Sequence, residues 1–106
     1  MNDFDPIILE KVEHESRVFH LKAPLVINVE FNQGENQLEA RFEPLEIWVL
    51  AEDREQLEKR VIEGVAEELA LLWDEYALAD PATLSRMALK MREKVLATFE
   101  EVKNEL

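Results

Sequence analysis

Cysteine is absent from this chain of 106 residues, and glycine occurs only twice. Without cysteine, the chain has no disulfide framework and no thiolate for catalysis or metal binding. The scarcity of glycine and a hydrophobic content of 47% argue against a chain that is disordered throughout. A chain of this length suits one small domain, and we expect residues 1–106 to form it.

Positive charge is also scarce, because 12 Lys and Arg residues face 24 Asp and Glu residues, which gives a net charge of −12. Nucleic acids and anionic membranes both need a cationic protein face, so neither is expected as a direct partner. No apolar run approaches the ~18 residues that span a bilayer, and no secretory signal is expected. These absences favour a cytoplasmic protein, and the acidity favours either solubility or a basic protein as its partner.

Alternation of apolar and polar residues predicts an antiparallel hairpin in the first half of the chain. Residues Leu25–Asn32 and Gln37–Phe42 both alternate in this way and are separated by a short polar turn. The apolar run Leu45–Leu50 predicts a third strand that is covered on both faces, or nearly so. Residues 1–23 are expected to add a strand or an N-terminal arm.

Two amphipathic helices are expected in the second half of the chain. Asp53 is a suitable N-cap for the first helix, and Gly64 in its middle suggests close approach to a strand or another helix. The apolar stripe of this helix includes Leu57, Val61, Val65 and Leu69. Asp80 followed by proline is typical of a helix start and predicts a second helix over residues 81–104. The predicted fold is α+β, with a small antiparallel sheet of three or four strands followed by two long helices, the first packed on the sheet.

Residues suited to catalysis or metal binding are few and do not form a standard pattern. Adjacent carboxylates, such as Glu67 and Glu68, diverge by about 100° on a helix and do not face each other across a pocket. His14 and His20 could bind a metal ion with a neighbouring glutamate, but their spacing matches no standard site, and surface histidines are the simpler interpretation. We therefore expect no enzymatic activity, no cofactor and no metal.

Acidic and aromatic residues near the third strand and the first helix are the candidate protein-binding residues. Acidic groups attract a basic partner, and tryptophan and tyrosine dominate the binding energy of many interfaces. The candidates are Trp48, Glu52, Asp53, Glu55, Glu67, Glu68, Trp73 and Tyr76. For the three aromatic residues the alternative is packing in the core, and for the acids it is a solvated helix face.

The junction between the third strand and the first helix resembles the HicB-type antitoxins. A strand that ends in Ala51-Glu52-Asp53 continues directly into Arg54–Leu57, and the similarity extends over about residues 25–76. The resemblance implies a degraded RNase H-like fold and a cytoplasmic prokaryotic protein that masks a small basic RNA-cleaving toxin. Residues 81–106 are too short for the helix-turn-helix of many members, so operator binding is not implied.

Two functional hypotheses follow. The first is a non-enzymatic, acidic, antitoxin-like interaction module that masks a small basic protein. The alternative is a self-assembling homodimer, formed through the second helix or through paired sheet edges, because the apolar stripe of residues 84–102 has no obvious cover. A binder of metal or of a small ligand through His14 and His20 is a third possibility.

Overall fold

The computed structural model describes residues 2–102, which form six strands and two α-helices. The strands are β1 (Ile7–His14), β2 (Arg17–Ile27), β3 (Val29–Asn32), β4 (Gln37–Phe42), β5 (Ile47–Ala51) and β6 (Phe99–Val102). The helices are α1 (Arg54–Leu72) and α2 (Arg86–Thr98). Three short helical segments are also present, namely the 3₁₀ turns η1 (Glu43–Leu45) and η3 (Pro81–Thr83) and the π-helical segment η2 (Trp73–Ala77). The predicted α+β class is confirmed.

The strands form two antiparallel sheets of three strands each, whereas one sheet of three or four strands was predicted, so that prediction is confirmed only in part. In the first sheet β2 lies between β1 and β6, and in the second β4 lies between β3 and β5. The chain passes from one sheet to the other at Asn28, which divides the predicted strand Leu25–Asn32. The alternation continues through this division because Ile27 and Val29 on either side are both buried. Residues 1–23 were predicted as a strand or an arm; residue 1 lies outside the described residues, and the others include β1 and most of β2.

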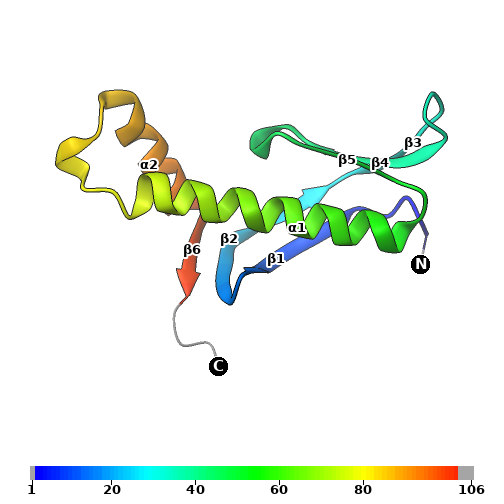
Figure 1. Cartoon of the computed structure of the whole chain (residues 1–106), viewed down its shortest axis with the longest axis horizontal. Helices are drawn as coiled ribbons and strands as arrows, with labels where there is room; N and C mark the ends of the chain where they lie inside the picture. The colour runs from blue at the N-terminus through cyan, green and yellow to red at the C-terminus, as the bar shows by residue number, and fades with distance from the viewer. Residues whose placement is uncertain (1, 103–106) are drawn as a thin grey trace.

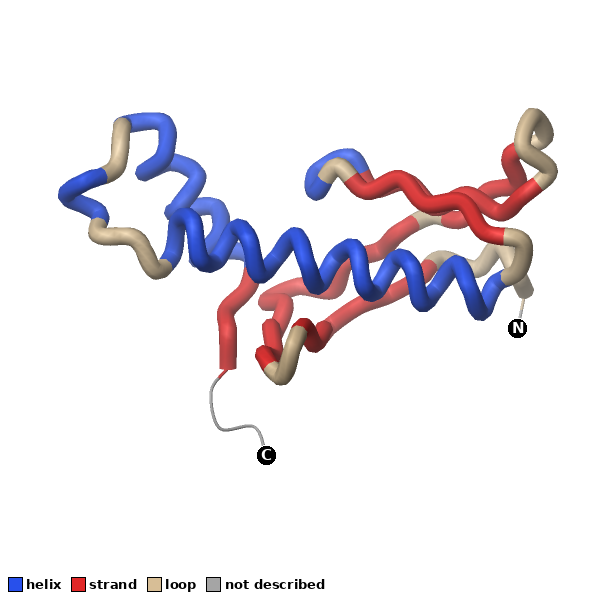
Figure 2. The backbone as a smooth tube through the Cα atoms, viewed as in Figure 1, coloured by secondary structure: helices blue, strands red, loops and turns tan. Residues whose placement is uncertain are grey.

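Helix α1 packs against both sheets and connects them (Figures 1 and 2). Its contacts are most numerous with β1 and β5, one strand from each sheet. The buried residues of the helix are Leu57, Val61, Val65, Ala66, Leu69 and Ala70. The predicted apolar stripe is therefore confirmed, and so is the N-cap, because the Asp53 carboxylate accepts a hydrogen bond from the Gln56 backbone N–H at 2.8 Å.

The second predicted helix is shorter than residues 81–104. Ser85 is the N-cap of α2, with its hydroxyl oxygen accepting a hydrogen bond from the Ala88 backbone N–H at 3.2 Å. Asp80 instead caps the short turn η3. The helix ends at Thr98, and residues 103 and 104 of the predicted helix lie outside the described residues.

The chain leaves α2 as a strand because Phe99 is needed in the core. The backbone of Phe99 is extended, and β6 pairs antiparallel with β2. The Phe99 ring is only 1% exposed and packs against Phe19 and Trp73 at centroid distances of 6.0 and 5.8 Å. The apolar spacing typical of a helix continues past Val95 to Phe99 and Val102, but residues 99–102 form a strand. Burial of Phe99 against residues from distant parts of the chain therefore outweighs the local helical pattern.

Gly64 faces β5 from the middle of α1, but the space beside it would accept a side chain. A Cβ atom at this position would lie 3.7 Å from Ile47 Cδ1, an ordinary van der Waals distance. We therefore expect Gly64→Ala to raise the free energy of unfolding by about 0.5–1 kcal/mol, because alanine loses less backbone entropy in a helix. Chemical denaturation of the two proteins measures the difference, and a less stable variant would mean that the glycine is required for packing.

Candidate functional site

Exposed acidic side chains follow the solvent face of α1 from its junction with β5. We call this row the acidic ridge, and its members are Glu52, Glu55, Glu63 and Glu67. Along α1, the row consists of Glu55, Lys59, Glu63 and Glu67 at intervals of four residues. It runs parallel to the buried stripe on the opposite face of the helix. Among residues 2–102, none of the four carboxylates forms an ion pair within 4 Å, and neither does Lys59. The ridge is therefore a row of exposed negative charges that one lysine, Lys59, interrupts.

Two of the predicted acidic residues, Asp53 and Glu68, are not members of the ridge. The Asp53 carboxylate is engaged as the N-cap of α1, and Glu68 is half-buried. Conversely, the prediction omitted Glu63, which the four-residue spacing from Glu55 through Lys59 could have revealed. The ridge is thus better defined by exposure than by adjacent pairs of acids in the sequence.

Trp48 lies on the outer face of the second sheet and is 60% exposed. Its indole N–H donates a hydrogen bond to the Glu39 carboxylate, and the Arg41 guanidinium lies 5.4 Å from the ring centroid. The expectation that residues 45–50 are covered on both faces is wrong at this position. Helix α2 does not supply the second cover because it packs against η2, β2 and β6 instead.

Trp73 and Tyr76 lie in η2, which continues α1, and both are half-buried. Trp73 packs on Phe99. Trp73 and Tyr76 both border the hydrophobic core. The eight predicted residues therefore occupy three separate places: the outer face of a sheet, the start and solvent face of α1, and the contact between η2 and α2. The structure does not bring them together into one site.

Arg17 connects three parts of the chain through two carboxylates. Its guanidinium donates to Asp74 of η2 at 2.7 and 2.9 Å, and to Glu101 of β6 at 2.9 and 3.3 Å. It also lies 5.2 Å from the centroid of the Phe19 ring. Hydrogen bonding to Arg17 lowers the pKa of Asp74, and hydrogen bonding to Asp74 and then to Glu101 raises the pKa of Arg17. No sequence spacing indicated this network, because its members are far apart in the chain.

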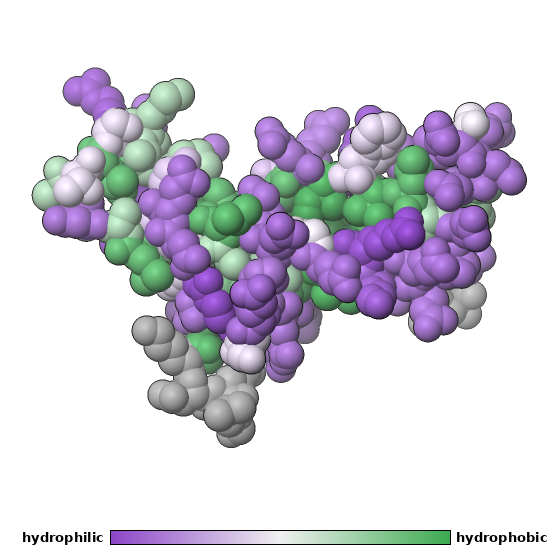
Figure 3. Space-filling view, in the orientation of Figure 1, coloured by the Kyte–Doolittle hydropathy of each residue, from purple (hydrophilic) through white to green (hydrophobic). Residues whose placement is uncertain are grey.

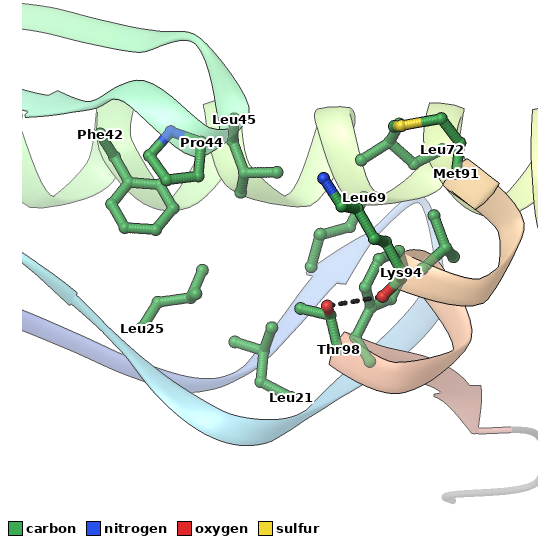
Figure 4. A pocket seen from close by; sticks show the side chains of 12 residues that line it. Leu21, Leu25, Phe42, Pro44, Leu45, Leu69, Leu72, Met91, Lys94 and Thr98 are labelled. Atoms are coloured by element: carbon green, nitrogen blue, oxygen red, sulfur yellow. Dashed lines mark hydrogen bonds between the residues drawn. The ribbon is translucent and has the colours of Figure 1, made fainter. Parts of the chain in front are cut away.

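An apolar cavity of about 490 Å³ opens where the two sheets diverge near α2. It is lined by Leu21 and Leu25 of β2, Phe42 of β4, Pro44 and Leu45 of η1, Leu69 and Leu72 of α1, Met91, Lys94, Val95 and Thr98 of α2, and Phe99 of β6. Figure 4 shows these side chains surrounding a common space, and Figure 3 shows hydrophobic surface between α2 and the second sheet. The lining is almost entirely hydrophobic, and Lys94 is its one charged residue.

The two histidines lie apart within the first sheet. His14 is beside the turn that joins β1 to β2, with Nε2 3.9 Å from Glu15, whereas His20 is paired with Lys11 across the strands. Within residues 2–102, no three His, Cys, Asp or Glu side chains gather closely enough to hold a metal ion. In the same part of the chain, neither helix has the length and apolar character needed to cross a membrane.

No family model, curated protein or solved structure matches this chain. The similarity to HicB-type antitoxins therefore stays a prediction based on residues 25–76.

Proposed function

We propose that the chain is a non-enzymatic protein-interaction module that binds a small basic protein through the acidic ridge. The observation that carries the proposal is the row of exposed carboxylates at the start and along the solvent face of α1, which have no ion-pair partner within residues 2–102, in a chain with a net charge of −12. A surface of one charge sign steers an oppositely charged protein toward it and disfavours partners of like charge. The rigid helix holds these carboxylates in a fixed row, which suits a partner with a basic groove or helix.

In its antitoxin-like form, the proposal identifies the partner as a small basic RNA-cleaving toxin in the cytoplasm. The ridge would then mask the cationic surface on which the toxin binds RNA. This identification rests on the resemblance at residues 51–57, whereas the basic character of the partner rests on the charge of the ridge.

Reversing the charge of the four ridge glutamates is expected to weaken binding of the purified partner by about 100-fold. Each reversal turns an attraction into a repulsion and costs under ~1 kcal/mol of binding free energy. The variant is Glu52→Lys, Glu55→Lys, Glu63→Lys and Glu67→Lys. It leaves the Asp53 cap intact, so the start of α1 is preserved. Isothermal titration at two salt concentrations measures the affinity, which should fall with salt for the wild-type protein.

The matched control reverses four exposed acids away from α1: Glu10→Lys, Glu13→Lys, Glu35→Lys and Glu43→Lys. Both variants carry the same net charge. Binding that weakens equally in the two variants would show that overall charge, and not the ridge, attracts the partner. Binding that survives reversal of the ridge would contradict the proposal.

A homodimer is the second proposed function, and exposed apolar residues near the α2 end favour it. Leu71 and Leu78 are more than half exposed, and Met87 on α2 is 80% exposed. Such residues can form a self-complementary interface between two copies. Sedimentation at high micromolar concentration tests this alternative, which requires a dimer with no other protein present.

A further inference from the structure

The apolar cavity has one charged residue in its lining, and this combination suggests a ligand. Ten of its twelve lining residues are hydrophobic, and only Lys94 and Thr98 are polar. The Thr98 hydroxyl already donates a hydrogen bond to the Lys94 backbone carbonyl at 2.6 Å (Figure 4). The ammonium group of Lys94 is therefore the principal polar group left to meet a ligand. A volume of about 490 Å³ lies in the range of ~300–1,000 Å³ that is typical of small-molecule pockets.

Within residues 2–102, Lys94 has no carboxylate partner, although an acidic chain could readily supply one. The chain contains 24 acidic residues, yet among residues 2–102 none lies within ion-pair distance of Lys94. The side chain extends from α2 over the cavity in Figure 4. An ammonium group beside leucine side chains is complementary to a molecule that has an aliphatic body and one anionic end.

The surroundings of Lys94 favour a single negative charge over a phosphate group. Lys94 lies just before the last turn of α2 and is the one cation in the cavity lining. A dianion would meet the strongly negative chain with only this one cation in the lining to compensate it. A carboxylate needs only one charge-assisted contact, which Lys94 can supply.

We propose that this cavity binds an aliphatic monocarboxylate of the fatty-acid type, with its carboxylate on Lys94 Nζ and its chain among Leu21, Leu25, Leu69 and Leu72. The proposal concerns a site separate from the acidic ridge. Binding of a carboxylate here does not depend on the proposed protein partner, because no ridge residue lines the cavity.

Calorimetric titration with octanoate, decanoate and dodecanoate tests the site on the whole protein. Each pair of added methylene groups is expected to tighten binding about tenfold, because each buried CH₂ contributes ~0.8 kcal/mol. Lys94→Gln should weaken decanoate binding about fivefold to tenfold and leave the affinity for 1-decanol unchanged. The control Lys90→Gln removes the same charge from an exposed position of α2 outside the cavity lining and should change neither affinity.

The methionine methyl groups provide a second readout that needs no variant. On addition of decanoate, the NMR signal of Met91, which lines the cavity, should shift saturably, whereas that of the exposed Met87 should not. The proposal is overturned if no carboxylate binds at millimolar concentration, or if Lys94→Gln and Lys90→Gln behave alike. It is also overturned if the protein dimerises through the cavity and decanoate neither binds nor separates the copies.

Discussion

Phe99→Ala is expected to lower the free energy of unfolding by about 3–5 kcal/mol, the range for truncating a buried phenylalanine. The ring is 1% exposed and makes an edge-on contact with Phe19 and a tilted contact with Trp73. It therefore joins β2, η2 and β6 in the core. Because small domains are stable by only ~5–15 kcal/mol, this one substitution removes a large fraction of the total. Urea denaturation followed by fluorescence measures the loss.

Phe31→Ala is the matched control for this substitution. Phe31 on β3 is 47% exposed, so the same truncation removes much less buried area and should cost about 1 kcal/mol. If the two variants lose similar stability, Phe99 is not buried, and the assignment of residues 99–102 to a strand of the core is wrong.

Arg17→Met is expected to lower the free energy of unfolding by about 1–3 kcal/mol, since the Glu101 carboxylate loses its charged donor. The Glu101 side chain is only 14% exposed, so water replaces the lost hydrogen bonds poorly, whereas the half-exposed Asp74 is affected less. The methionine preserves an unbranched chain against Phe19. Lys59→Met is the control, because Lys59 forms no ion pair within the described part of the chain and its loss should change stability by under ~0.5 kcal/mol.

The Arg17 network also predicts how stability depends on pH. Arg17 lowers the pKa of Asp74 below its unfolded value of ~3.9, so the charged carboxylate stabilises the native state above that pH. This contribution is lost as the pH falls below ~4 and through the lower native pKa. Denaturation between pH 6 and pH 2 should therefore show that the wild-type advantage over Arg17→Met shrinks on acidification. An advantage that grows toward pH 2 would contradict the assigned interaction.

Local patterns in the sequence predicted the elements but not how they divide into sheets. The Asp53 cap and the stripe from Leu57 to Leu69 are determined within a few residues, and both are present in the structure. The division at Asn28 depends on which strand each half pairs with, and alternation carries no information about pairing partners. The end of α2 at Thr98 depends on burial of Phe99 against distant residues.

Local sequence patterns likewise predict only part of the candidate site. Exposed acids on a helix follow from its periodicity, so most of the ridge could be predicted from the sequence, including Glu63. The cavity beside Lys94 is formed by six elements that meet only in the folded chain. The exposure of Trp48 depends on the path of α2, which packs elsewhere.

Binding of a basic protein by this chain can be tested by capturing the tagged protein from a lysate of its own cells and weighing the intact complex by native mass spectrometry. We expect a stoichiometric complex with one small basic companion, which dissociates as the salt concentration rises because the ridge is exposed. A homodimer with no companion would contradict binding of a basic protein and favour the self-assembling alternative.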